Sequence, residues 1–270
     1  MKKFLLVLVI FFLLFIGLTY WSTSVTPEEI KISEIIEPQK SDIEHTDSVT
    51  VITSNLYESN QIKRFMQGRN YRGAWAAPIK APVFLLDSMK ILEEGGGHQT
   101  HSLDLQSPSG VVFSLRSVNK DPAPLIPGIA KTLGLEHIII DVISAQHPYG
   151  ALLAASLSDA AGVLNTRPKV VYLPKQDKLG KYNKNYGDRI YLLEYETEGK
   201  GNWTSYQNVL ELMDTDDLQE LKMEKGKHVQ IDDRAFVRAR LFDLLIGDWD
   251  RHAKQLGGVV QQEGENYKAI

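Results

Sequence analysis

The stretch LLIGDWDRHAKQ, residues 244–255, decides the fold of this sequence. Two acids, an arginine, a histidine, a lysine and an amide crowd around Trp249. Residues 235–246 carry apolar side chains at the three- and four-residue spacing of an amphipathic helix, and two aspartates precede them. We therefore expect the polar stretch in a loop at the end of a packed helix. A solvated loop explains the charges, but it explains less readily their mixture beside a tryptophan.

The segments around this loop are interpreted from the same kind of pattern. Acidic, Leu-bearing residues 208–225 suit a surface helix, and residues 256–261 and 267–270 flank a polar turn, which predicts a hairpin. Residues 201–270 are thus expected to form a helical part that carries the loop and ends in the hairpin.

Upstream, residues 63–200 predict a β-rich part. Alternating apolar residues at 101–105 and 111–116 surround a Ser-Pro-Ser-Gly turn, which is typical of a hairpin. Residues 145–162 are rich in Ala and Leu and end in Gly, which predicts a helix packed on the sheet. Two further strands are expected at 168–174 and 189–195.

Glycines and a cation mark the two ends of the predicted hairpin. Gly95, Gly96 and Gly97 precede its first strand, and Arg116 ends its second. Backbone N–H groups of a Gly-rich turn can cover phosphates, and a cation can pair with them. A plain turn and a surface cation are the simpler interpretations of these residues.

The spacing within residues 248–255 fits phosphoryl transfer. That reaction needs an acid to orient the acceptor hydroxyl and a further oxygen ligand for Mg²⁺, and kinases place an Asn five residues after the catalytic Asp. Asp250 and Gln255 have this spacing. Kinases also place a Gly-rich turn, a cation, a helix, two hinge strands and a helix before that loop, which is the order predicted here.

These segments resemble a known family. LLIGDWDRHAKQ resembles the Gly-Asn-x-Asp-x-His-x-Lys-Asn loop of HipA-type kinases and is similar to the Trp-Asp loop of CotH spore-coat kinases. HPYGALLAASLSDAAGV followed by PKVVYLP resembles the helix and strand of HipA-type proteins. Together with FSLRSVNKDP, they are similar to a kinase-like module of large bacterial envelope proteins. The resemblance covers about residues 92–270.

The resemblance implies an α+β, kinase-like two-lobed fold with ATP and Mg²⁺ as cofactors if the protein is active. It makes Asp250 the catalytic acid, His252 a loop-positioning residue and Gln255 a metal ligand, and we group Asp248 with the catalytic residues. By the same resemblance, Gly95, Gly96, Gly97 and Arg116 would bind the nucleotide.

Several residues depart from the family pattern. Arg116 stands where these kinases have Lys, Gln255 replaces Asn, and the helix at 145–162 has no Glu to pair with Arg116. The second metal-binding Asp should follow the hairpin, so we expect a fold truncated before that segment. Phosphotransfer completed by a missing C-terminal part and a catalytically inactive pseudokinase or interaction module both remain open. A haloacid-dehalogenase-type phosphatase fits less well, because its Asp-x-Asp follows a strand.

The N-terminus predicts delivery out of the cytoplasm. Lys2 and Lys3 precede an unbroken apolar run at residues 4–18, and Tyr20 and Trp21 follow it. This pattern describes a signal anchor or a signal peptide within residues 1–24, and the aromatic pair favours an anchor that meets the membrane through residues 4–21. We expect the bulk of the chain to face the periplasm or the cell exterior.

Composition bounds the partners. Residues 25–62 are acidic and polar, which predicts a flexible linker, although residues 49–53 could pair as an edge strand. The net charge is −4 and no basic block occurs, so nucleic acid is not expected as a partner. The chain has no cysteine, which excludes disulfides and thiolate metal sites. An envelope protein is the macromolecular partner that the predicted location suggests.

Overall fold

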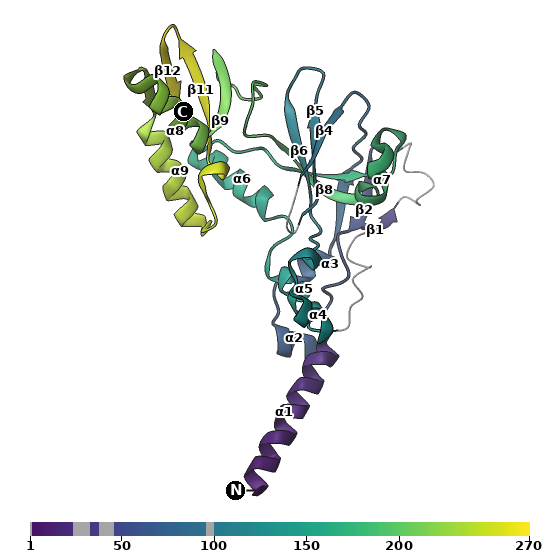
Figure 1. Ribbon diagram of the computed structural model, residues 1–270. Coiled ribbons are helices and arrows are strands. Elements are labelled where there is room, and N and C mark those ends of the chain that lie inside the picture. The colour runs from purple at the N-terminus through teal and green to yellow at the C-terminus, as the bar shows by residue number, and fades with distance from the viewer. Residues whose placement is uncertain (1, 24–32, 38–45, 96–99) are drawn as a thin grey trace.

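The protein is described by a computed structural model that covers residues 2–23, 33–37, 46–95 and 100–270. It has an α+β architecture, with a helical stalk at the N-terminus and three separate β-sheets beyond it (Figure 1). The expected α+β class and the N-terminal apolar helix are both confirmed.

The stalk is helix α1, Lys2–Ser22, whose apolar side chains stay exposed along its length. Its most apolar 18-residue window has a mean hydropathy of 2.7 and no buried residue, so by length and composition the helix could cross a membrane. The stretch Glu136–Ala161, with mean hydropathy 1.3, passes the same test. That stretch is divided into α5 (Glu136–Asp141), the 3₁₀ helix η4 (Val142–Ala145) and α6 (Gly150–Ala161), so it is not one continuous helix.

A small antiparallel sheet occupies part of the region that we expected to be a linker. It has the order β1-β2-β3, from Glu34–Glu37, Ser48–Ile52 and Pro78–Pro82. The apolar side chains of Val49 and Val51 are fully buried, which explains why this polar stretch is ordered. The linker prediction for residues 25–62 is therefore wrong over 33–37 and 46–62; residues 24–32 and 38–45 lie outside the described residues.

Between the stalk and the sheets lies a group of short helices that we call the neck. Its members are α2 (Gln61–Gln67), α3 (Arg72–Ala76), α4 (Gly128–Thr132) and α5. The 3₁₀ helix η3 (Ala123–Leu125) precedes α4, and α2 packs against the end of α1 (Figure 1).

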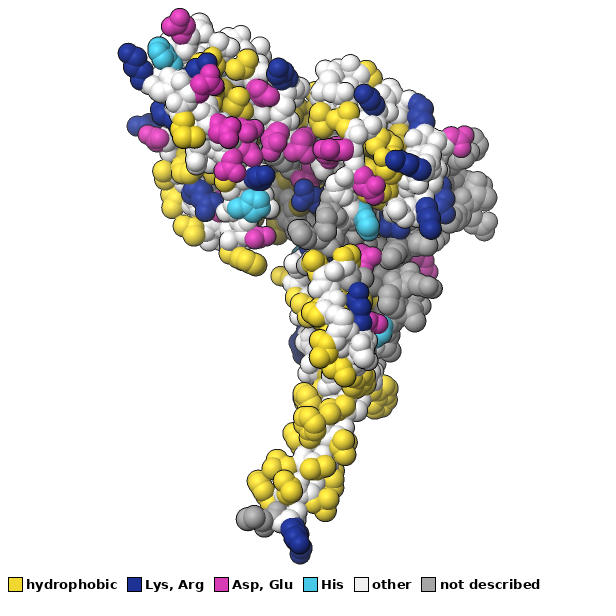
Figure 2. Space-filling model, viewed as in Figure 1, with side chains coloured by type: hydrophobic (Ala, Val, Ile, Leu, Met, Phe, Trp, Pro, Cys, Tyr) yellow, Lys and Arg dark blue, Asp and Glu magenta, His cyan; other side chains and the backbone are white. Residues whose placement is uncertain are grey.

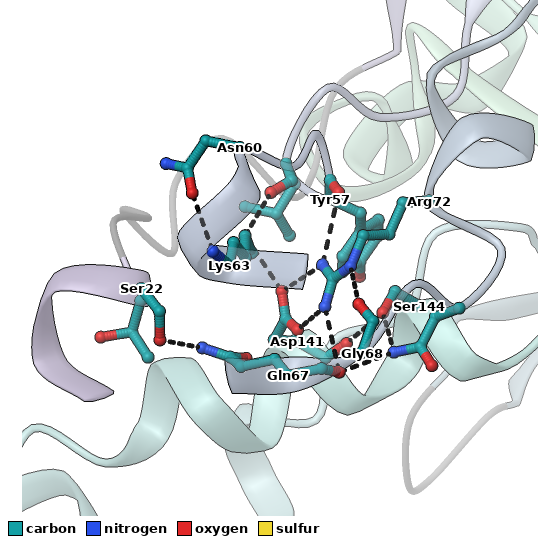
Figure 3. Close-up of polar contacts among 12 residues, drawn as sticks. Ser22, Tyr57, Asn60, Lys63, Gln67, Gly68, Arg72, Asp141 and Ser144 are labelled. Atoms are coloured by element: carbon teal, nitrogen blue, oxygen red, sulfur yellow. Dashed lines mark hydrogen bonds and ion pairs between the residues drawn. The ribbon is translucent and has the colours of Figure 1, made fainter. Parts of the chain in front are cut away.

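A buried carboxylate joins three helices of the neck. Asp141, at the end of α5, accepts a hydrogen bond from Arg72 Nη1 at 2.7 Å and pairs with Lys63 Nζ at 3.0 Å (Figure 3). Arg72 Nη2 contacts the second carboxylate oxygen, so the arginine binds in a bidentate manner. All three side chains are buried. The remaining donors are satisfied by main-chain oxygens, with Arg72 Nε donating to Gly68 at 3.0 Å and Lys63 Nζ donating to Leu56 at 3.3 Å.

The largest sheet, which we call the central sheet, has five antiparallel strands in the order β4-β5-β6-β8-β7. The strands are Lys90–Gly95, Ser102–Gln106, Val112–Ser117, Lys169–Leu173 (β7) and Arg189–Tyr195 (β8). The strands predicted from alternation are confirmed. The 3₁₀ helix η5 (Asp177–Tyr182) and α7 (Asn183–Tyr186) connect β7 to β8. Leu103, Leu115 and Tyr191 of the sheet form a buried cluster with residues of this connection.

The predicted helix at 145–162 is α6, which begins at Gly150, after Pro148. It packs mainly against α9, so the prediction that it covers the sheet is wrong. Leu153 and Leu157 stay exposed, and Ser158 is the residue of this helix that is buried.

Residues 209–270 form what we call the C-terminal unit, and it is less helical than expected. Its four strands have the order β10-β12-β11-β9, from Val229–Ile231, Asn266–Ala269, Gly257–Glu263 and Val209–Asp214. Its helices are α8 (Thr215–Lys225), the 3₁₀ helix η6 (Gly226–His228), α9 (Asp233–Ile246) and the 3₁₀ helix η7 (Ala253–Gln255). The terminal hairpin is confirmed. Residues 209–214 are a strand, because they pair with the open edge of that hairpin.

Asp141→Ala should destabilise the protein strongly. The change leaves two buried cations without a counter-ion, and breaking a buried ion pair costs about 3–5 kcal/mol. The free energy of unfolding, measured by denaturant titration of the full chain in detergent micelles, checks this. Glu220→Ala on the exposed face of α8 is the control, with an expected change within about 0.5 kcal/mol. Equal values for the two variants would contradict the structural role of Asp141.

Candidate functional site

A cleft of about 1220 Å³ opens between the central sheet, α6 and the C-terminal unit. Its walls come from β6, residues 194–198, α6, α9 and the loop at 248–255. Ligand pockets in proteins commonly measure about 300–1,000 Å³, so this cleft is large enough for a nucleotide-sized molecule.

Four of the predicted site residues line this cleft. They are Arg116 from β6 and Asp248, Asp250 and Gln255 from the loop after α9. His252 is exposed and is not among the lining residues. Gly95 ends β4 away from the cleft wall, where a Cβ would lie 2.6 Å from Ser102 Oγ, so glycine lets β4 and β5 approach closely. Gly96 and Gly97 lie outside the described residues.

A second buried carboxylate shapes the loop. Asp243, in the last turn of α9, pairs with Arg240 at 2.8 Å and with Arg251 Nη2 at 3.3 Å. Arg251 also pairs with Asp248 at 3.0 Å and donates from Nη1 to the main-chain oxygen of Gln255 at 3.0 Å. The helix ends at Gly247 in the left-handed conformation, with φ 75°. One arginine therefore ties both ends of the loop to the helix.

The two acids of the loop have different surroundings. Asp248 is half-buried and held by Arg251, which favours a role in loop shape. Asp250 is exposed toward the cleft, and among the described residues its carboxylate forms no hydrogen bond or ion pair. Asp250 is therefore the acid that remains free to meet a ligand.

On β6, Arg116 places a cation at the wall of the cleft. Arg116 is exposed on β6. Lys120 lies nearby, donates to Gln146 Oε1, and has its pKa lowered by burial and then by the Arg116 guanidinium. Lys120 belongs to the FSLRSVNKDP segment and is not among the residues that line the cleft.

The end of β8 and the segment after it carry negative charge into the same cleft. Glu194, Glu196 and Glu198 line it together with Asp214. Burial, followed by Asp214 and Glu196, raises the pKa of the Glu198 carboxyl. Figure 2 shows acidic side chains gathered between the C-terminal unit and the central sheet. Glu194 pairs across the sheet with Ser114, two residues from Arg116, so acids and the arginine share the sheet wall of the cleft.

The main-chain groups of Glu196, in this segment, already form hydrogen bonds within the chain. Glu196 N–H donates to Val112 O at 3.0 Å, and Glu196 O accepts from Trp203 Nε1 at 2.8 Å. The Trp203 indole stacks on Tyr195 with centroids 4.8 Å apart and an interplanar angle of 11°. Trp203 therefore covers the strand end from the cleft side, a contact that the sequence did not indicate.

Comparisons give no independent guide to this site. No protein-family model, curated protein or solved structure matches the chain. Within the described part of the chain, no group of three or more His, Cys, Asp or Glu side chains is arranged to hold a metal ion. Asp250 and Gln255 thus supply oxygen atoms at the cleft, but they do not form a complete metal site by themselves.

Sequence reasoning missed Asp243 and Arg251, which shape the loop. One signal was present: Asp243 follows Ala239 by four residues and so falls on the apolar stripe of the predicted helix. A charge on such a stripe is costly unless it is paired, and a cation a few residues later is the natural partner.

Arg251→Ala should loosen the loop at 248–255. The change removes two ion pairs and the hydrogen bond to Gln255, and loss of charged hydrogen bonds typically costs about 1.5–3 kcal/mol. Hydrogen–deuterium exchange should become faster over these residues and little elsewhere. Arg234→Ala, which removes an exposed arginine from the first turn of α9, is the control. Unchanged exchange in Arg251→Ala would mean that the ion pairs do not hold the loop.

Proposed function

We propose that this chain is a membrane-tethered, extracytoplasmic kinase-like protein whose cleft binds an ATP-type nucleotide with Mg²⁺. The observation that carries the proposal is the cleft itself. Arg116 from the central sheet faces the same space as Asp250 and Gln255 from the loop after α9. Side chains that the kinase resemblance selected from distant segments thus meet at one site.

The order of the elements supports the kinase-like interpretation. A pair of antiparallel strands, β4 and β5, flanks the glycines; β6 carries Arg116; α6 follows; β7 and β8 lead into the cleft-lining residues 194–198; and α9 leads to the loop. This is the series that the resemblance requires. The position of α6 against α9 is the main departure from it.

The tether is supported by α1. The helix has 21 residues, and at about 1.5 Å per residue its length matches a hydrocarbon core of about 30 Å. Lys2 and Lys3 at its start favour a cytoplasmic N-terminus, which would put the cleft in the periplasm or outside the cell.

The residues of the cleft would divide the work as follows. Arg116 would bind phosphate oxygens. Asp250, which has no competing partner in the described residues, would orient or accept the proton of an acceptor hydroxyl. Gln255 would offer its amide oxygen to Mg²⁺, which when bound neutralises charge on the transferring phosphoryl group. A further acidic ligand is needed, and an envelope protein partner could supply it.

A pseudokinase or interaction module is the second candidate. Glu196 uses both its main-chain N–H and its C=O within the chain, so a base that bound there would have to displace Trp203. Acids on the same wall would also repel phosphates. In this alternative the cleft keeps the architecture but transfers no phosphate, and its surface binds an envelope partner.

Asp250→Asn should separate these candidates. In native membranes, where a partner is present, phosphotransfer with Mg²⁺-ATP should fall by about 10²–10⁴-fold, because the loss of a catalytic base typically costs this much. Nucleotide binding should be little changed. Asp248→Asn is the matched control and should lose less, since Arg251 keeps Asp243 as a partner.

The measurements are phosphate release or transfer, and equilibrium binding of a fluorescent ATP analogue. Binding that Arg116→Ala abolishes, without any turnover, would support the pseudokinase. If the wild-type chain binds no nucleotide and neither Asp variant changes any activity, the interaction module is the better account.

A further inference from the structure

The neck is joined to the stalk without a spacer. Ser22, the last residue of α1, accepts a hydrogen bond from Gln67 Nε2 of α2 at 2.8 Å, and Tyr20 donates its hydroxyl proton to the main-chain oxygen of Leu133, just after α4. Gly134 lies against the Tyr20 ring, because a Cβ added at Gly134 would lie 3.5 Å from Cε1 of that ring. Helices α2 and α4 are thus fixed at the level where α1 ends (Figure 1).

The same two helices expose large apolar side chains. Phe65 on α2 is 84 % exposed, and Ile129 and Leu133 at α4 are 73 % and 52 % exposed. Figure 2 shows hydrophobic side chains that continue from the stalk onto the neck. Exposed cations lie beside them, with Arg64 next to Phe65 and Lys131 between Ile129 and Leu133. Apolar side chains flanked by cations suit the boundary between lipid headgroups and acyl chains.

The dimensions of a bilayer determine how far the neck would lie from the hydrocarbon core. Its polar layers add about 5–7 Å on each side of a hydrocarbon core of about 30 Å. If α1 fills the core, Tyr20 and Trp21 lie at its outer edge, and anything in direct contact with them lies within the polar layer. Helices α2 and α4 meet that condition through Ser22 and Tyr20.

We propose that the neck is a second membrane-contacting surface, in which Phe65, Ile129 and Leu133 enter the headgroup layer while Arg64 and Lys131 meet lipid phosphates. The inference rests on the membrane anchoring proposed above. Its consequence is that the part of the protein that carries the cleft cannot swing freely on the stalk. Two contacts with the bilayer, together with the Asp141 ion pairs inside the neck, fix the height and orientation of the cleft above the membrane.

The absence of cysteine from the sequence allows a direct test. Phe65→Cys and Ile129→Cys, each in the full chain, are labelled with an environment-sensitive nitrobenzoxadiazole dye and reconstituted into phosphatidylcholine–phosphatidylglycerol vesicles. Both positions are exposed, so the changes remove no buried packing. Leu14→Cys in α1 is the membrane control, and Met223→Cys on α8, 79 % exposed, is the aqueous control.

We expect the dye at positions 65 and 129 to emit at shorter wavelength and to lose intensity when headgroup-proximal spin-labelled lipid is added. The dye at position 223 should do neither. If position 14 is quenched by acyl-chain spin-labelled lipid but positions 65 and 129 behave like 223, the neck proposal is overturned and the anchor stands. A blue shift without quenching would mean contact with protein, which also overturns it. If position 14 is not quenched by spin-labelled lipid that carries its label deep in the acyl chain, the anchor fails and the neck proposal fails with it.

Discussion

The buried carboxylate of Asp141 is the constraint on which the rest of the molecule depends. It holds Lys63 of α2 and Arg72 of α3 against the end of α5, so segments far apart in the sequence meet in one small neck. Because all three groups are out of water, each needs the others, and the arrangement has few alternatives. The stalk attaches below this cluster through Ser22 and Gln67, and the small sheet packs above it.

At the cleft, Asp243 is a second buried carboxylate that pairs with two cations. It is buried, it holds two arginines, and one of them positions the loop that carries Asp250. Asp141 joins elements and serves stability, whereas Asp243 sets the course of a short loop. The loop acid that takes part in the ion pairs, Asp248, is thereby occupied, and the acid beyond it is left free toward the cleft. Asp248 thus serves the structure of the loop, and Asp250 is left for the proposed chemistry.

The sequence predicted the local elements better than their partners. Alternation at 101–105 and 111–116 predicted β5 and β6, and the helical period at 235–246 predicted α9, because these patterns report local geometry. Residues 46–62 were expected in a linker, with an edge strand at 49–53 as the alternative; that strand is β2, which pairs on both sides, and its two buried valines order a segment that is polar by composition. Arg116, Asp250 and Gln255, which were chosen from the sequence, line the same cleft, whereas the stacking of Trp203 on Tyr195 at its wall depends on tertiary contacts that no single-sequence pattern contains.

The central claim is that the cleft between the central sheet and the C-terminal unit binds a nucleotide. Hydrogen–deuterium exchange of the full chain, with and without Mg²⁺ and a non-hydrolysable ATP analogue, tests it most directly. We predict slower exchange over three separate segments that share this cleft, namely β6, residues 194–198 and residues 248–255. Protection confined to one of them, or no change at saturating analogue, would contradict the claim.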